Sequence, residues 1–323
     1  MSLTRELDLK DSPASRFFSE QLDAARVAAF AKNGRAKLRG WPLQVSAPPE
    51  TARHASALGT AFDYLVRSVT WNMTLDSTVA AAAVTQGSAG FQWFGGDDSV
   101  LNTRTGASYA PSDWEDLQRA DPSFARWYWL LVLWGQIQQR WVQARHRQDE
   151  LLALCVIVAW VEGIHRSGQW AAALLDGWQC GDNVEGMMSR VPAAVIDDLG
   201  GMLAFYRTTQ MAEWTGRQVI QNPAFAGSRD VGGADADWIV EGVLWDMKTT
   251  KNPAPSFPMS VKQILGYALL DYDDRYHIDR VGLYYPRFGE FLEWPVAELL
   301  AELSGVPQSI AEWRTQWRAT VTV

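Results

Sequence analysis

Three aspartates and a lysine stand within a span of fourteen residues, at Asp235, Asp237, Asp246 and Lys248. The residues around them alternate between polar and apolar types, and Glu241-Gly242 lies midway, so the segment predicts a β-hairpin with a two-residue turn. Pairing the strands outward from that turn places Asp237 opposite Asp246 and Asp235 opposite Lys248. Side chains alternate faces along a strand, so all four project from one face. Directly opposed side chains are roughly 5 Å apart at Cβ, and the charged groups are therefore expected to converge.

The same pairing places Trp238 opposite Trp245 on the other face of the hairpin. On the charged face, opposed aspartates repel each other, and three carboxylates near one lysine leave net negative charge on a half-buried sheet. A divalent cation removes that difficulty, since Mg²⁺ and Mn²⁺ prefer hard oxygen ligands and retain several waters. A metal-bound water is easier to deprotonate, and Lys248 beside it can orient that water or stabilise the transition state. These residue types indicate phosphodiester hydrolysis.

These residues resemble the D…(D/E)xK core of the PD-(D/E)XK nuclease superfamily, and more closely its RecB-type exonuclease branch, whose pattern is roughly GxxD…DxKT. The two parts correspond to Gly232-Gly233-Ala234-Asp235 and Asp246-Met247-Lys248-Thr249. The branch also carries a QxxxY motif on the helix after the DxK strand, and Gln263-Ile264-Leu265-Gly266-Tyr267 has that spacing, fifteen residues after Lys248. Residues 281–296 resemble the strand pair that closes such nuclease cores. A lone DxK is a weak signal, but the agreement of five positions is much more specific.

The resemblance implies a Mg²⁺- or Mn²⁺-dependent deoxyribonuclease. By that likeness Asp235 and Asp246 are metal ligands, the carbonyl of Met247 completes the metal shell, and Lys248 serves the attacking water. Gln263 becomes a candidate for orienting that water or for contacting the scissile phosphate.

Some assignments around this core stay open. Asp235 matches the family's spacing and is ranked first as a metal ligand, but a register shift in the hairpin exchanges its role with that of Asp237. Tyr267 suits the core as well as it suits substrate contact. Lys251 and Lys262 flank the site, where they either neutralise DNA phosphates or stand as solvated surface lysines.

A further motif of the branch, GxxxH on an N-terminal helix, supplies a metal-binding histidine. The candidate here is Gly59-Thr60-Ala61-Phe62-Asp63, in which Asp63 takes the place of the histidine. Asp is a competent ligand, so Asp63 joins the predicted metal site. The branch often adds a four-cysteine iron–sulfur cluster, which this chain cannot hold because its cysteines are Cys155 and Cys180 alone.

The order of elements predicts an α/β fold. The resemblance to the nuclease superfamily implies a restriction-endonuclease-like core, in which helices flank a central mixed sheet, with a large helical insertion. Helical spacing is expected over residues 13–31, 55–69, 122–214, 260–270 and 296–317, and strands over 280–285 and 291–294. The predicted domains are N-terminal core helices over 1–70, a helical insertion over 71–215 with a mobile loop near 87–113, and a catalytic α/β core over 216–323.

A row of tryptophans and a short basic segment can each be interpreted either as a functional surface or as a structural feature. Trp127, Trp134 and Trp141 recur every seven residues, a stripe that can stack on bases, but their apolar neighbours favour a helix–helix seam. The segment 32–39 contains four basic residues in eight positions. It can contact phosphates, although a solvated surface is the default for so short a run.

The composition sets outer limits. With 47% hydrophobic and 20% charged residues, the chain is not of the disordered class. The formal net charge of −8 argues against a protein that coats nucleic acid through overall charge, while a local basic groove is compatible with it. There is no signal-peptide block, and the apolar runs are shorter than the roughly 18 residues of a membrane span, so a cytoplasmic protein without a membrane partner is expected.

DNA is the expected substrate. Similar nucleases often work beside helicases or in defence and repair systems, so the likeness also implies a helicase or a defence-system protein as partner. One rival hypothesis is a nuclease fold that holds DNA or a protein with little turnover. The other is a helical interaction protein whose tryptophan-rich region carries the function.

Overall fold

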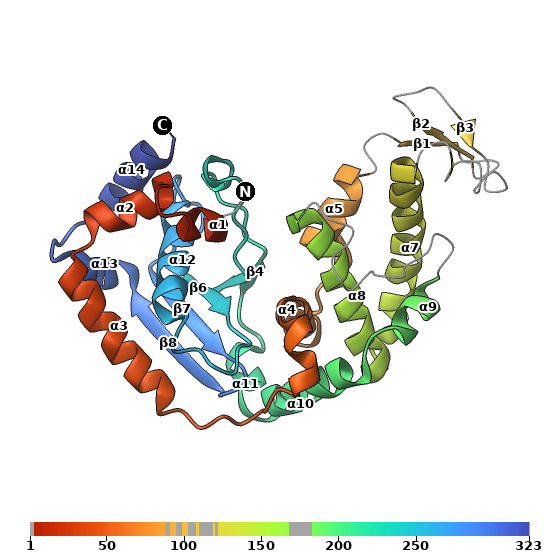
Figure 1. The fold of residues 1–323 in the computed structure, drawn as a ribbon, viewed down its shortest axis with the longest axis horizontal. Helices are drawn as coiled ribbons and strands as arrows, with labels where there is room; N and C mark the ends of the chain where they lie inside the picture. Colours follow the sequence, from red (N-terminus) through yellow and green to blue (C-terminus); the bar gives the residue numbers. More distant parts are fainter. Residues whose placement is uncertain are drawn as a thin grey trace. The chain divides into compact units, whose positions relative to one another are not determined.

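The computed structural model describes residues 3–87, 91–94, 99–102, 108–109, 119, 122–167 and 183–322. The chain divides into two compact units (Figure 1). Unit 1 combines residues 1–47 with 201–323, and unit 2 consists of residues 48–200. The unit that interrupts the sheet-containing part therefore begins at residue 48, ahead of the predicted insertion at 71, and it ends at residue 200.

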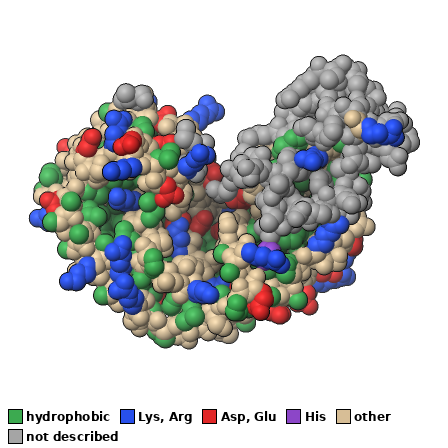
Figure 2. Space-filling view, viewed as in Figure 1, with side chains coloured by type: hydrophobic (Ala, Val, Ile, Leu, Met, Phe, Trp, Pro, Cys, Tyr) green, Lys and Arg blue, Asp and Glu red, His purple; other side chains and the backbone are tan. Residues whose placement is uncertain are grey.

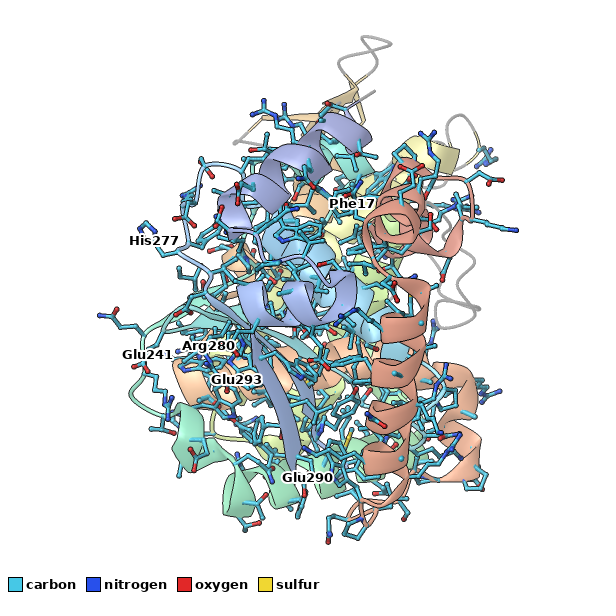
Figure 3. The ribbon with its side chains drawn as sticks, turned by 90° about the vertical axis from the view of Figure 1, so that its left-hand side faces the viewer. Phe17, Glu241, His277, Arg280, Glu290 and Glu293 are labelled. Carbon is cyan, nitrogen blue, oxygen red and sulfur yellow. The ribbon has the colours of Figure 1, made fainter. Side chains whose placement is uncertain are left out.

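Unit 1 is built on a five-stranded mixed sheet in the order β4-β5-β6-β7-β8. Its strands are β4 (Val219–Gln221), β5 (Trp238–Val240), β6 (Val243–Met247), β7 (Arg280–Tyr285) and β8 (Glu290–Pro295). Strands β6 and β7 are parallel, whereas the other neighbours are antiparallel. Figure 3 shows Arg280 and Glu293 side by side on β7 and β8, where they form an ion pair. The α/β class expected from the sequence is confirmed.

The hairpin β5–β6 has the predicted register. Trp238 pairs with Trp245, Ile239 with Leu244 and Val240 with Val243. Glu241 and Gly242 have φ of 49° and 82°, and positive φ at both central residues is the signature of the tight type I′ turn. The ladder then ends at Trp238, because residues 235–237 form no strand paired with β6.

Helices cover both faces of this sheet. On one face α12 (Phe257–Leu269) packs against β6 and β7, with α2 and α14 beyond it (Figure 1). Phe17 on α2 contacts Trp313 and Trp317 on α14, and all three rings are buried. The helices of this face are α1 (Leu3–Asp8), α2 (Pro13–Gln21), α3 (Ala24–Arg39), α12, α13 (Val296–Ser304) and α14 (Ile310–Val321). A short 3₁₀ turn, η4 (Ser228–Val231), precedes β5.

The opposite face of the sheet carries an aromatic cluster. Trp214, in the short helix α11 (Met211–Trp214), contacts Trp238, Trp245 and Tyr284 edge-on or tilted. Both hairpin tryptophans thus lie on the face that the alternation of side chains predicts.

Two predicted helices are each divided. The predicted helix over 13–31 breaks at Leu22, because the Asp23 side chain accepts a hydrogen bond from the Arg26 N–H and begins α3 as its N-cap. Helix α3 then continues to Arg39, beyond the predicted end at residue 31. The predicted C-terminal helix over 296–317 is two helices in the structure. Helix α13 ends at Gly305, where φ is 79°, and α14 begins after Ser309, which caps it with a capping box.

Unit 2 is mainly helical, as predicted. Its elements are η1 (Pro49–His54), α4 (Ala55–Trp71), η2 (Leu75–Ser77), α5 (Val79–Gly87), α7 (Pro122–Ala144), α8 (Gln148–Ser167), α9 (Val184–Ser189) and the first half of α10 (Ala193–Thr209). Trp134 and Trp141 are buried on α7, which packs against α8, as the predicted helix–helix seam requires, whereas Trp127 is half-buried.

The predicted loop near 87–113 contains regular structure. Three short antiparallel strands, β1 (Phe91–Phe94), β2 (Ser99–Asn102) and β3 (Ser108–Tyr109), form a sheet there. The rest of that segment lies outside the described residues. Of the helices within the described ranges, none is both long and apolar enough to cross a membrane.

Candidate active site

Strand β6 presents Asp246 and Lys248 on one face of the sheet. They are two residues apart, so both side chains follow Leu244 toward the side that α12 covers. Asp246 is only 5% exposed, and the Lys248 side chain is 24% exposed. Lys248 Nζ lies 2.7 Å from Asp246 Oδ2. A half-buried ammonium group therefore balances a buried carboxylate.

Helix α12 brings the predicted glutamine to the same lysine. Lys248 Nζ donates a hydrogen bond of 2.8 Å to Gln263 Oε1. An ammonium group has no acceptor, so the amide must turn its oxygen toward Lys248 and its nitrogen away. Gln263 Nε2 accordingly donates to the Tyr267 hydroxyl at 2.9 Å and to Thr4 Oγ1 at 3.0 Å. The structure thus joins Asp246, Lys248, Gln263 and Tyr267 in one continuous chain of contacts.

The ring of Tyr267 belongs to the core. It is buried and stacks on Phe225 with ring centroids 6.1 Å apart. Its hydroxyl reaches Gln263 at the edge of that core. Thr4 on α1 adds a second support to the same amide, which no sequence motif indicated.

Asp237 caps the end of β6. Its Oδ2 accepts a hydrogen bond of 2.6 Å from the Met247 N–H. A side-chain carboxylate thus replaces the next rung of the β5–β6 ladder. The backbone groups of a strand point alternately to its two sides, and the Lys248 N–H donates to the Tyr284 carbonyl on β7. The carbonyl of Met247 therefore points to the opposite side, toward the segment that contains Asp235 and Asp237.

Asp235 lies in that segment, where it is exposed just before the start of β5. It follows Gly232 and Gly233, whose φ values of 72° and 117° are ones that glycine adopts readily. Its backbone forms an isolated bridge with Ala224. Its carboxylate makes no hydrogen bond or ion pair with another residue that the structure describes.

Asp63 is on α4, which belongs to unit 2, whereas the residues described above belong to unit 1. It is buried and forms an ion pair with Arg67, one helical turn further along. The arginine neutralises a carboxylate that would otherwise be buried without compensation. This pairing gives the Asp at the GxxxH position a structural partner.

The two flanking lysines differ in environment. Lys251 is exposed in the loop after β6, while Lys262 is half-buried on α12, and burial lowers its pKa. Their contacts with substrate stay a prediction.

The close grouping of three carboxylates expected from the hairpin is not formed. Among the described residues, no three His, Cys, Asp or Glu side chains gather into one candidate metal-binding group. The ladder ends before Asp237, so the side chains of Asp235 and Asp237 do not face β6 as regular cross-strand partners. The ligand set of Asp235, Asp246 and the Met247 carbonyl stays a prediction.

Two buried polar atoms at this site lack a hydrogen bond among the described residues. One is Asp246 Oδ2, which has Lys248 nearby but not in hydrogen-bonding geometry. The other is the hydroxyl of Tyr285 on β7, a residue only 1% exposed. Burial, and secondly the carboxylate of Asp246, raise the pKa of Tyr285. Sequence reasoning missed Tyr285, because its position in an apolar strand gives no sign of a polar neighbour.

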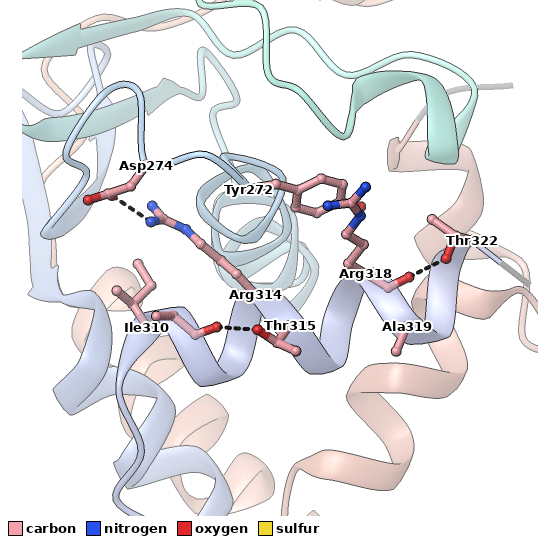
Figure 4. A pocket seen from close by; sticks show the side chains of 9 residues that line it. Tyr272, Asp274, Ile310, Arg314, Thr315, Arg318, Ala319 and Thr322 are labelled. Carbon is pink, nitrogen blue, oxygen red and sulfur yellow. Dashed lines mark hydrogen bonds and ion pairs between the residues drawn. The ribbon is translucent and has the colours of Figure 1, made fainter.

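A separate pocket of about 540 Å³ lies between α14 and the segment after α12 (Figure 4). Its buried guanidinium, that of Arg314, is committed to Asp271, Asp274 and the Ala268 carbonyl. Arg318 lies over the ring of Tyr272 at 5.1 Å. These contacts tie α14 to the end of α12, and the pocket contains none of the candidate site residues.

Comparisons of the chain with models of known families, with curated proteins and with solved structures find no match.

Proposed function

We propose that this protein is a divalent-metal-dependent nuclease that hydrolyses phosphodiester bonds of DNA, and that its sheet is a restriction-endonuclease-like core. The observation that carries the proposal is the meeting of β6 and α12 at Lys248. Its Nζ lies 2.7 Å from Asp246 Oδ2 and 2.8 Å from Gln263 Oε1. The DxK and QxxxY motifs lie apart in the sequence, yet the lysine of the first donates a hydrogen bond to the glutamine of the second. A charge cluster with a purely structural role gives no reason for that contact.

The residues at the site fit a Mg²⁺ or Mn²⁺ ion. Asp246 is buried with an oxygen that accepts no hydrogen bond among the described residues, the Met247 carbonyl points to the side of Asp235, and the Asp235 carboxylate is uncommitted. These are hard oxygen donors, the kind that both ions prefer. When bound there, such an ion would lower the pKa of a coordinated water and neutralise charge on the scissile phosphate.

Lys248 supplies a donor where the reaction needs one. An ammonium group has three N–H donors, and among the described residues Gln263 accepts a hydrogen bond from one of them, while Asp246 is an ion-pair partner at 2.7 Å. A donor that Gln263 does not take can hold the attacking water or a non-bridging phosphate oxygen. Gln263 limits the motion of the lysine because its amide is itself fixed by Tyr267 and Thr4. Gln263 is thus a positioning residue.

The test is cleavage of linear duplex, circular and single-stranded DNA with Mn²⁺ or Mg²⁺. Lys248→Met removes the ammonium group while keeping the length of the side chain, and Lys10→Met is the matched control on an exposed lysine. We expect Lys248→Met to lower kcat by about 10²- to 10³-fold, the usual effect of losing one transition-state donor, with the control unchanged. Mn²⁺ binding measured by calorimetry should weaken in Asp246→Asn.

The possible results separate the hypotheses. Cleavage that survives Lys248→Met would remove the lysine from the mechanism. No cleavage by the wild type together with no metal binding would favour the rival, a nuclease fold that only holds DNA or a protein.

A further inference from the structure

Helix α3 is the most strongly basic element of unit 1. It carries Lys32, Arg35, Lys37 and Arg39 and has no acidic residue between Ala24 and Arg39, in a chain whose formal net charge is −8. Figure 2 shows Lys and Arg side chains gathered at the lower left, over the part of the molecule that Figure 1 labels α3. This local charge is opposite in sign to that of the whole protein.

The inner face of α3 fixes the helix against the candidate site. Phe30 stacks on Phe257, the first residue of α12, with ring centroids 5.7 Å apart. A Cβ on Gly34 would come within 2.0 Å of the Phe257 ring, so glycine is what lets the two helices approach this closely. Leu38 continues this inner face into the core. Beyond the helix, Trp41 contacts Tyr285, the residue whose hydroxyl lies near Asp246.

Three of the basic residues share one outward stripe. Lys32, Arg35 and Arg39 stand at positions i, i+3 and i+7, which fall on one side of a helix. None of the three forms an ion pair or hydrogen bond with another residue that the structure describes. Several other arginines of the described chain pair with carboxylates, namely Arg67, Arg140, Arg280 and Arg314.

A purely structural explanation accounts for part of this charge only. Cations in the last turn stabilise the negative end of the helix dipole, and that reason covers Lys37 and Arg39. Lys32 and Arg35 lie before the last turn, and at their positions the helix dipole has little effect. Arg35 is half-buried, and its Nε is buried with no hydrogen-bond acceptor in the described structure. Because that Nε is closed off from solvent, an external phosphate can be reached only by the terminal nitrogens of the guanidinium.

We propose that the stripe Lys32, Arg35 and Arg39 binds the phosphate backbone of the DNA substrate, an inference that rests on the proposed nuclease function. Seven residues of helix rise about 10 Å. One DNA strand rises about 3.4 Å per phosphate along its axis while it also winds around that axis, so the stripe matches a short run of one strand, and the long Lys and Arg side chains let each cation reach a phosphate. Helix α3 then holds the backbone beside the helix that carries Gln263.

The experiment compares two triple variants that change the net charge equally. The first is Lys32→Gln, Arg35→Gln and Arg39→Gln. The second is the control, Lys10→Gln, Arg16→Gln and Arg145→Gln, which alters exposed basic residues elsewhere. Binding of a fluorescein-labelled DNA duplex is followed by anisotropy in EDTA, so that no cleavage occurs, at several salt concentrations. Circular dichroism checks that both variants keep their helices and their melting temperatures.

Each lost phosphate contact should reduce the salt dependence of binding by about 0.9 in the slope of log Kd against log salt, hence by about 2.7 for the stripe. Between about 50 and 200 mM salt, the wild type should then lose about 40-fold more affinity than the stripe variant. The control should keep the wild-type slope. With metal present, the stripe variant should raise KM and leave kcat unchanged.

The outcomes separate this inference from the proposed function. If the wild type binds and cleaves DNA and the stripe variant keeps the wild-type slope, the stripe is a solvated surface or serves an acidic protein, and the inference fails alone. If the wild type binds DNA through the stripe without cleaving it, the nuclease proposal fails, but the inference that the stripe binds DNA is supported. If the wild type neither binds nor cleaves DNA, both fail.

Discussion

The contact between Lys248 and Gln263 makes the strongest quantitative prediction, because it can be measured without any substrate. Their 2.8 Å hydrogen bond has a charged donor, and such bonds contribute about 1.5–3 kcal/mol. The Lys248 side chain is 24% exposed, so water competes for the ammonium group. We therefore expect a coupling free energy of about 1–1.5 kcal/mol between Lys248→Met and Gln263→Leu, somewhat below that range.

The assay is urea unfolding of four proteins in EDTA: the wild type, the two single variants and the double variant. Gln263→Leu also removes the bonds to Tyr267 and Thr4, but these are lost in both backgrounds and cancel in the cycle. In the cleavage assay, Gln263→Leu should lower kcat by about 10- to 100-fold, as loss of a supporting residue does. It should have no further effect in the Lys248→Met background.

Two results would refute this reasoning. A coupling energy below about 0.3 kcal/mol is within the error of additivity and would mean that the bond is not formed in solution. Normal coupling together with wild-type kcat in Gln263→Leu would mean that Gln263 stabilises the fold without positioning Lys248 for chemistry.

Three further predictions concern other parts of the molecule. Tyr285→Phe should leave the free energy of unfolding in EDTA unchanged or raise it, because its buried hydroxyl has no partner among the described residues. Tyr284→Phe loses a bond to Gln210 and should cost about 1 kcal/mol, and equal losses in the two variants would reveal a hidden partner of Tyr285. Cys155 is buried, and burial raises its pKa, so peptide mass spectrometry should find it alkylated only after unfolding; labelling of the native protein at the rate of a free thiol would contradict this. Ser309→Ala should destabilise the protein by about 1 kcal/mol at neutral pH through loss of the N-cap of α14. Hydrogen bonds from the Ser309 N–H and Oγ lower the pKa of Glu312, so their contribution is present above the ordinary Glu pKa and lost as pH falls through the lowered one. Of these two bonds, Ser309→Ala removes only the one from Oγ, so the gap between the thermal melts of wild type and variant should narrow in acid; it should not close, because the bond from the Glu312 N–H to Ser309 Oγ does not titrate. A gap that stays constant with pH would refute the Oγ–carboxylate contact.

The hairpin could be predicted because its information is local. Glu241-Gly242 suits a turn with positive φ at both residues, and the alternation around it sets the pairing of Trp238 with Trp245. The helix containing Gln263 was equally visible from its apolar spacing. What the spacing could not show is where the ladder ends. The Asp237 carboxylate competes for the Met247 N–H, and that competition depends on geometry in three dimensions.

Contacts between distant segments were invisible for the same reason. Thr4 supports Gln263 across 259 positions of the chain, and neither residue carries a signal for the other. Tyr285 looks like an ordinary strand residue until its hydroxyl is found buried near Asp246. The break before α3 was readable, since Asp23 is a good N-cap, but the apolar periodicity on both sides of it concealed the change of direction.

The discontinuous makeup of unit 1 has a consequence for synthesis on the ribosome. Phe17 on α2 is buried against Trp313 and Trp317 on α14, about 300 residues later. At about 5–20 residues per second, the apolar faces of the N-terminal helices wait roughly 15–60 s for these partners. Unit 2 is complete well before then and can fold first. The N-terminal helices, exposed during that interval, are therefore the natural binding site for a chaperone on the nascent chain, and slow translation is expected to increase aggregation.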